Sequence, residues 1–251
     1  MIIDSHAHLA SGKGALFSVV MSASQLKDEF LARGVERAVV FTGDGFWRDS
    51  RESNDRLAEQ VKPFLDFYIP WATVHPYEGQ AAVDEVRRSV EVLGMKGLKF
   101  HSWLQGFSVS TKWMYTIVEE AIKLKIPITF HDGTPPYSSP LQIANLARLY
   151  PEATIILSHS GLRDLWPDAL LAAQELKNIW LGFGGPTLAG MQKIVDTLGA
   201  DRIIYGSDGG LGHPSAISYA LKIVNELRIA DADREKILGR NIARLLKIFL
   251  D

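Results

Sequence analysis

The sequence predicts an α/β fold, a single (β/α)8 TIM barrel that forms one domain over residues 1–251. The first observation is the length of the chain, because 251 residues suffice for eight strand-plus-helix units of about 31 residues each. The second observation is that short β-branched or aliphatic runs alternate with longer segments of helical periodicity. Together they favour a closed ring of parallel strands.

Eight apolar runs are expected to form the strands. They begin at Met1, Val35, Phe67, Met95, Ile126, Thr154, Asn178 and Asp201. These starts are 23 to 34 residues apart, which leaves room for one crossover helix between consecutive strands. Connections of this length join parallel strands, whereas antiparallel strands can be joined by short turns.

Several helix boundaries are visible in the sequence. Ser24 is expected to cap the first helix, and Gly34 stands where the chain leaves it. Ser139 followed by Pro140 predicts the start of a helix that ends near Tyr150. The alternation is not interrupted by a Ser/Gly-rich tract, a charge block or a low-complexity run, which indicates one domain.

Glycine motifs argue against an open nucleotide-binding sheet. The stretch ASGKG after Leu9 lacks the G-x-G-x-x-G spacing of a dinucleotide fingerprint and also fails as a phosphate loop. The GFGG run at residues 182–185 follows the wrong strand and is expected to mark a close backbone approach at the barrel rim. No G-x-S-x-G motif occurs, which weakens the serine hydrolase alternative.

Composition excludes several kinds of chemistry and of partner. The absence of cysteine excludes thiol nucleophiles, disulfides, iron–sulfur clusters and cysteine-ligated zinc. A net charge of −2 argues against nucleic acid as a partner. No apolar run approaches the roughly 18 residues that a membrane span needs. We therefore expect a cytoplasmic protein with a small-molecule substrate, and a homo-oligomer is left open.

Seven histidines give the strongest functional signal. Six lie in or just after the last residues of a predicted strand: His6, His8, His75, His101, His131 and His159. His213 follows the eighth strand by a few residues. Barrel enzymes place their active sites at the carboxyl ends of the strands, so we expect these side chains to converge on one mouth.

A metal site is predicted at this mouth. His6 and His8 are two residues apart on a strand, so both point to the same face. Such a pair alone is as typical of packing as of metal binding. His131, His159 and Asp208 at other strand ends favour metal binding, because imidazole and carboxylate are ligands of zinc, iron and manganese.

The motifs themselves resemble those of the amidohydrolase superfamily, and more narrowly the family that includes aminocarboxymuconate semialdehyde decarboxylase-like enzymes. The resemblance rests on DSHAHL at 4–9, GLKFH at 97–101, ITFHDG at 128–133, ILSHSG at 156–161, YGSDGG at 205–210 and EKILGRNIARLL at 235–246. It implies that His6, His8, His131 and Asp208 hold one metal ion. It also implies that His159 acts on the substrate or binds a second ion.

Lys99 decides between one ion and two. It precedes His101 by two residues, so both side chains point the same way and either could meet a second metal or the substrate. Binuclear members of the superfamily bridge two metals with a carboxylated lysine on the fourth strand, so the resemblance allows that role for Lys99, which related mononuclear enzymes do not need. The expected state is an ammonium that pairs with Asp208 or a substrate carboxylate. Zinc is the expected cofactor, with manganese or iron as alternatives.

The expected reaction is hydrolysis of an ester, lactone or amide by metal-activated water. Asp208 would move the proton and His159 would stabilise the developing charge or act as a second acid or base. The alternative is non-oxidative decarboxylation of a small aromatic or unsaturated carboxylic acid, which the same residues support. A metal-free binding barrel is a third reading.

Loop residues extend these expectations to the substrate. Trp47, Arg48 and Trp103 follow predicted strands and are candidate substrate contacts. His75 is expected to be a hydrogen-bonding residue of the rim, and His213 a weak candidate for substrate contact. Asp4 is expected to share the inward face of His6 and His8 and to support their rings, while Asp132 and Asp164 either do the same or cap loops.

Overall fold

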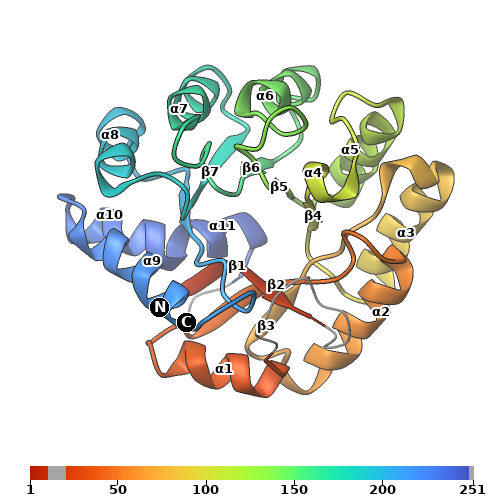
Figure 1. Ribbon diagram of the computed structural model, residues 1–251, viewed down its shortest axis with the longest axis horizontal. Helices are drawn as coiled ribbons and strands as arrows, with labels where there is room; N and C mark the ends of the chain where they lie inside the picture. Colours follow the sequence, from red (N-terminus) through yellow and green to blue (C-terminus); the bar gives the residue numbers. More distant parts are fainter. Residues whose placement is uncertain (11–20, 249–251) are drawn as a thin grey trace.

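The computed structural model describes residues 1–10 and 21–248, and its strands form the ring that the sequence predicts (Figure 1). The strands are β1 (Ile3–Leu9), β2 (Arg37–Thr42), β3 (Tyr68–Pro70), β4 (Leu98–Phe100), β5 (Ile128–Phe130), β6 (Ile155–Leu157), β7 (Ile179–Phe183) and β8 (Ile203–Tyr205). Each lies within one of the eight predicted runs.

All paired strands are parallel, in the order in which they occur along the chain. Strands β1 to β3 pair as one group, and β4 to β8 pair as a second group. Two isolated parallel bridges join the groups, one between Ala72 and Leu98 and one between Ala7 and Gly209. These bridges close the barrel, so the predicted TIM-barrel fold is confirmed.

The helices surround the strands (Figure 1). They are α1 (Ala23–Leu31), α2 (Ser50–Val61), α3 (Gln80–Glu91), α4 (Ser102–Gln105), α5 (Lys112–Leu124), α6 (Pro140–Leu149), α7 (Trp166–Glu175), α8 (Leu188–Leu198), α9 (Ser215–Glu226), α10 (Asp231–Glu235) and α11 (Asn241–Leu246). Short 3-10 turns at Lys62–Phe64 and Pro76–Glu78 and a π turn at Lys236–Arg240 add to them. No helix in the described ranges is both long and apolar enough to cross a bilayer.

Helix starts agree with the sequence at α6 and differ at α1. Ser139 caps α6, and its hydroxyl accepts the Gln142 N–H. The expectation that Ser24 caps α1 is wrong, because Ser22 does so in a reciprocal capping box with Gln25. In a capping box the residue three positions after the cap returns a hydrogen bond, and Gln25 can do this only for Ser22.

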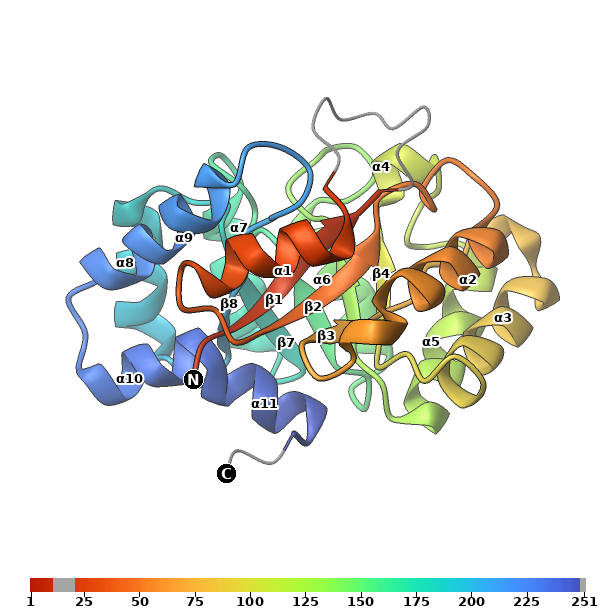
Figure 2. The same cartoon turned by 90° about the horizontal axis from the view of Figure 1, so that it is seen from below.

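Two apolar clusters hold the barrel together. The larger one lies largely between the strands and the surrounding helices. The smaller one contains interior strand residues such as Ile3, Val39 and Ile204 together with Ile242 and Ala243 of α11. Figure 2 shows α11 at the end of the barrel where the chain begins and α4 at the opposite end. Helix α11 therefore closes the amino-terminal end, and the polar strand residues lie at the other.

The GFGG run lies at the end of β7, where the backbone approaches the segment that follows β6. A side chain at Gly182 would collide with the carbonyl of Ser158, and one at Gly185 with the carbonyl of His159. The predicted close backbone approach is therefore present. Of the other glycine-containing stretch, ASGKG, residues 11–14 lie outside the described part of the chain.

Candidate active site

The carboxyl ends of the strands bring the predicted imidazoles into one group. The ring centroids of His6 and His159 lie 5.0 Å apart, and those of His131 and His159 lie 4.5 Å apart. The rings of His101 and His131 stack at 3.8 Å. Side chains from β1, β4, β5 and β6 thus meet at one mouth, as their positions at the strand ends predict.

Three donor atoms form a compact triangle within this group. His6 Nε2 lies 3.1 Å from His8 Nε2, and His8 Nε2 lies 3.1 Å from Asp208 Oδ1. The third side, from His6 Nε2 to Asp208 Oδ1, is 3.3 Å. Adjacent ligands of a divalent ion with bonds near 2.1 Å are separated by about 3.0 to 3.4 Å. The triangle therefore has the dimensions of one face of a metal site.

A bulge in β1 aims both histidines inward. The pairing register with β2 shifts by one residue between Asp4 and Ala7. Side chains an odd number of positions apart on a regular strand point to opposite faces. Because of the shift, Ile3 and His6 both point into the barrel. The regular alternation of side chains from which Asp4 was expected to share the inward face of His6 and His8 is therefore wrong. Asp4 Oδ1 accepts the backbone N–H groups of His6 and Ser207, at 2.8 and 3.2 Å, and supports the backbone rather than an imidazole.

The protonation states of these groups suit a metal ion. Burial lowers the pKa of His6 to about 3, with a further contribution from Lys99, and burial also lowers the pKa of His8. Neutral imidazoles are the form that binds metals. Burial raises the pKa of Asp208, but its hydrogen bonds to His6 and His8 outweigh that effect and hold the pKa well below its usual value.

His159 supplies a further donor. It is 5% exposed, and its Nε2 atom is buried without a hydrogen-bond partner among the described residues. Donor atoms of His6, His159 and Asp208 all lie within 4.8 Å of one another. A buried ring nitrogen without a partner is costly, and a ligand or metal would supply the missing interaction. The donor set therefore fits a divalent cation.

His131 lies at the edge of this donor set. Its Nε2 atom is 3.0 Å from the Thr134 hydroxyl, and its ring is stacked on His101. The structure brings His131 to the mouth without adding it to the triangle of His6, His8 and Asp208. Its role as a fourth ligand stays a prediction.

Asp208 reaches the triangle because of its backbone. Its φ is 59°, in the left-handed region that non-glycine residues rarely adopt, and its N–H donates to the His6 carbonyl at 2.9 Å. This bond fixes the residue after β8 against β1. The Asp208 side chain remains 46% exposed, so it also faces the open mouth.

Lys99 is a buried cation in contact with the triangle. Its Nζ atom lies 3.2 Å from His6 Nε2 and donates to the Ser158 hydroxyl at 3.0 Å. Burial lowers the pKa of Lys99 to about 7, and the charges of Asp208 and Asp132 oppose the decrease. Lys99 thus lies beside the donor triangle. Whether it acts as a second metal ligand or as a substrate-binding ammonium stays a prediction.

A cavity of about 150 Å³ opens beside these groups. His8, Lys99, His101, His131 and Asp208 line it together with Phe46, Leu104 and Leu211. The predicted substrate contacts Trp47, Arg48 and Trp103 are not among these lining residues, and Trp103 is 52% exposed. Their neighbours Phe46 and Leu104 turn inward instead. Leu211 was not foreseen, since its position depends on how the chain leaves β8.

The remaining candidates lie away from the cavity. His75 Nε2 donates to the Gln105 carbonyl at 2.7 Å, and its Nδ1 accepts the Tyr77 N–H, so it is the rim residue that was expected. His213 is exposed and accepts the Ser215 N–H at 3.2 Å. Asp164 is exposed, whereas Asp132 is fully buried under His159 and accepts backbone N–H groups.

Comparison with known proteins identifies the family of the chain. The model of the family described as amidohydrolase matches residues 3–248. The chain belongs to the amidohydrolase family. It is 26% identical over 251 residues to gamma-resorcylate decarboxylase of Rhizobium sp. (strain MTP-10005), covering 79% of this chain and 76% of that protein.

Solved structures of two decarboxylases superpose over nearly the whole chain. The 2,6-dihydroxybenzoate decarboxylase from Rhizobium matches with a TM-score of 0.77 and 20% identity, covering 98% of each chain. The 5-carboxyvanillate decarboxylase from Novosphingobium aromaticivorans, complexed with manganese, matches with a TM-score of 0.78 and 14% identity, covering 99% of this chain and 96% of that one. At these identities the superpositions establish the fold.

Proposed function

We propose that this amidohydrolase-family protein is a metal-dependent decarboxylase of a small aromatic carboxylic acid. The sequence alone favours hydrolysis of an ester, lactone or amide. The names of the relatives favour decarboxylation instead. The curated relative, at 26% identity, supports this reaction class rather than a particular substrate.

One observation in the site carries the proposal: the lining of the cavity combines polar groups with apolar side chains. His8, Lys99 and Asp208 provide the polar groups. Phe46, Leu104 and Leu211 provide apolar surface. A volume of about 150 Å³ is well below the roughly 300 Å³ at which pockets for drug-sized ligands begin. The cavity therefore suits one ring with a carboxylate at one end.

The metal would be held by His6, His8 and Asp208, with His159 or His131 completing the set. A divalent ion bound there would polarise a substrate carboxylate beside it. Zinc was the first expectation from the ligand types, and manganese is the ion named with the Novosphingobium relative. Imidazole and carboxylate ligands suit both ions.

The chain's own residues would guide the proton. Decarboxylation breaks the bond between the ring carbon and the carboxylate carbon, releases carbon dioxide and leaves the electron pair on the ring. The ring carbon then takes up one proton, which comes from solvent. Asp208 is placed to relay it, because its side chain borders the cavity and is 46% exposed. Lys99 and His101 border the same cavity and would orient the carboxylate.

The test is turnover of hydroxybenzoates by the protein loaded with Mn²⁺ or Zn²⁺. We expect 2,6-dihydroxybenzoate or a related acid to release carbon dioxide in amounts equal to the acid consumed. Asp208→Asn should lower kcat by about 10² or more, since relayed protons typically contribute that much. Asp164→Asn is the matched control, because Asp164 is an exposed carboxylate outside the cavity.

Hydrolysis is the competing outcome. If the loaded protein cleaves aryl esters or lactones and releases no carbon dioxide from any hydroxybenzoate, the proposal is wrong and the hydrolase reading holds. A protein that takes up neither Mn²⁺ nor Zn²⁺ would instead support the metal-free binding barrel.

A further inference from the structure

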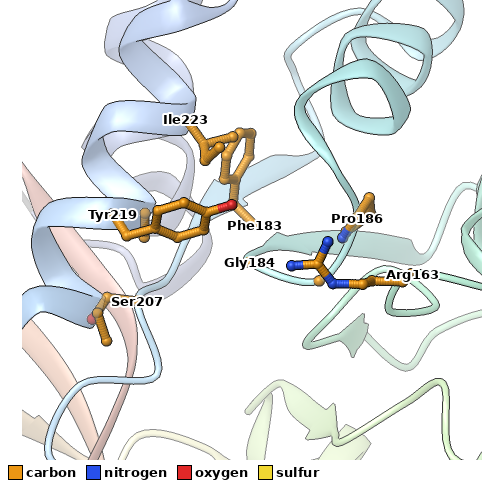
Figure 3. Close-up of a pocket in the computed structure, with 10 residues that line it drawn as sticks. Arg163, Phe183, Gly184, Pro186, Ser207, Tyr219 and Ile223 are labelled. Carbon is orange, nitrogen blue, oxygen red and sulfur yellow. The ribbon is translucent and has the colours of Figure 1, made fainter. Parts of the chain in front are cut away.

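A second cavity of about 200 Å³ lies beside the metal cavity, between helix α9 and the loop that follows β7 (Figure 3). The residues that give it its chemistry are Arg163, Phe183, Gly184, Pro186, Tyr219 and Ile223. Among the described residues, none lines both this cavity and the one that contains Asp208. The proposed decarboxylation makes no use of it.

Arg163 is the charged group of this cavity. Figure 3 shows its guanidinium entering from the loop after β6, and Tyr219 reaching in from α9 with its hydroxyl turned inward. Within residues 1–10 and 21–248, Arg163 makes no ion pair and no side-chain hydrogen bond. The other residues that line the cavity carry no charge. An anion that enters would therefore meet one unpaired cation.

The walls select the kind of anion. Phe183 is 2% exposed, and Ile223 and Ala220 add aliphatic surface from α9. A doubly charged phosphate would lose its hydration against these apolar walls with only one cation to compensate. The apolar body of a monocarboxylate would instead contact the apolar walls. Its planar carboxylate would accept two N–H groups of the Arg163 guanidinium.

The backbone segments that border the second cavity also carry or contact residues of the metal site. Gly185 packs so closely on the His159 carbonyl that a side chain there would collide with it. Ser207, which lines the cavity, directly precedes Asp208 and donates its backbone N–H to Asp4. A ligand in the second cavity would therefore contact the segments that carry His159 and Asp208 without touching either side chain.

We propose that this second cavity is a binding site for a small monocarboxylate with an aromatic or branched aliphatic body, held by Arg163 and Tyr219. The occupant is separate from the molecule that is decarboxylated. The inference stands on the cavity alone, so it survives if the reaction at the metal site proves to be hydrolysis.

The test uses 4-fluorobenzoate as the probe and the metal-loaded 251-residue chain. Binding is measured by ¹⁹F NMR titration of the parent protein and fitted to two sites, so that the metal ligands stay in place. Arg163→Gln should weaken one of the two affinities at least tenfold and leave the other unchanged. Tyr219→Phe should weaken the same affinity about threefold by removing one hydroxyl. Lys222→Gln is the matched control, since Lys222 is an exposed cation on α9 that does not line the cavity.

Crystals soaked with the same probe give the location. Density for the probe between Arg163 and Tyr219, together with the loss of affinity in Arg163→Gln, is the expected result. Probe density confined to the metal cavity overturns the proposal. So does equal affinity of the Arg163→Gln, Tyr219→Phe and Lys222→Gln proteins, because each folded variant would then bind without the groups that define the site.

Discussion

The carboxylate of Asp132 holds the turn that carries His159. Its Oδ1 accepts the His159 N–H at 2.7 Å, and its Oδ2 accepts the Gly161 N–H at 2.5 Å. The residues after His159 have positive φ angles of 47° at Ser160, 83° at Gly161 and 56° at Leu162. Such a backbone persists only where its surroundings fix it. Asp132 therefore positions the histidine whose Nε2 atom is left without a partner.

Replacing Asp132 by Asn should destabilise this turn. An amide can accept one of the two N–H groups through its oxygen, but its NH₂ group faces the other donor. We expect the free energy of unfolding to fall by about 1 to 3 kcal/mol, the cost of an unsatisfied buried group. Urea unfolding measures it, and Asp164→Asn serves as the control. An unchanged unfolding free energy would show that Asp132 does not hold the turn.

The metal-free protein should lose stability in acid. Burial lowers the pKa of His6 and of His101 to about 3, against 6.5 in an unfolded chain. As the pH falls from 6.5 towards 3, these histidines bind protons in the unfolded state but not in the folded state. The free energy of unfolding therefore decreases. Each histidine contributes on the order of 1 kcal/mol per pH unit.

Two buried carboxyl groups act in the opposite direction over part of this range. Burial raises the pKa of Asp4 to about 7 and that of Asp132 to about 6, so both residues add stability as the pH falls from these values towards 3.8. The histidines of the mouth outnumber such groups, and the net effect should be a loss. Urea unfolding of chelator-treated protein at pH 7 and pH 5 tests this. His101→Gln should reduce the pH dependence and the exposed His213→Gln should not; the reverse pattern would contradict the assignment.

Metal content should depend on the triangle of donors. We expect one ion per chain by elemental analysis, with His6→Gln weakening metal binding by at least tenfold because it removes one corner. Lys99→Met should retain the ion, since it removes a cation 3.2 Å from His6 Nε2. Two ions in the parent protein and one in Lys99→Met would argue instead for a carboxylated, bridging Lys99.

Substrate affinity should depend on Leu104 rather than on Trp103. Leu104 lines the metal cavity, whereas its neighbour Trp103 is 52% exposed and lies outside the lining. Leu104→Ala should raise KM by about tenfold, the effect of losing a few methylene contacts in a pocket. Trp103→Ala is the matched comparison and should leave KM within about twofold. A larger effect of Trp103→Ala would restore Trp103 as a substrate contact.

Helix α11 should contribute to stability without affecting the chemistry. Ile242 is fully buried in the barrel interior at the end opposite the histidines. Ile242→Ala should lower the free energy of unfolding by about 2 to 5 kcal/mol through lost burial and a residual cavity. The kcat of the folded, metal-loaded variant should be unchanged. A fall in kcat at full metal occupancy would show that the two ends of the barrel are coupled.

The positions of the strands and of their histidines could be predicted because both follow from short-range patterns. Apolar runs at regular spacing define the strands, and a residue at the end of a strand lies at the mouth of any closed barrel. The inward aim of His6 has a different origin, since it depends on a bulge that only pairing with β2 reveals.

Side chains on loops were harder to predict for the same reason. Trp47 and Trp103 stand next to Phe46 and Leu104, and the sequence offers no signal that tells which neighbour turns inward. Leu211 lines the cavity after a segment in which both Asp208 and Gly210 have positive φ, so its place depends on how the chain turns after β8. Such positions depend on long-range packing, which a single sequence does not encode in a readable local pattern.

The contact between His8 and Asp208 joins residues 200 positions apart. During synthesis the ribosome releases the two histidines of β1 first and the aspartate only after all eight strands have emerged. A nascent chain therefore carries a histidine pair but lacks the carboxylate that completes the triangle. At the proposed metal site, high-affinity capture would have to wait until the barrel closes, so metallation would be a late step that reports on correct folding.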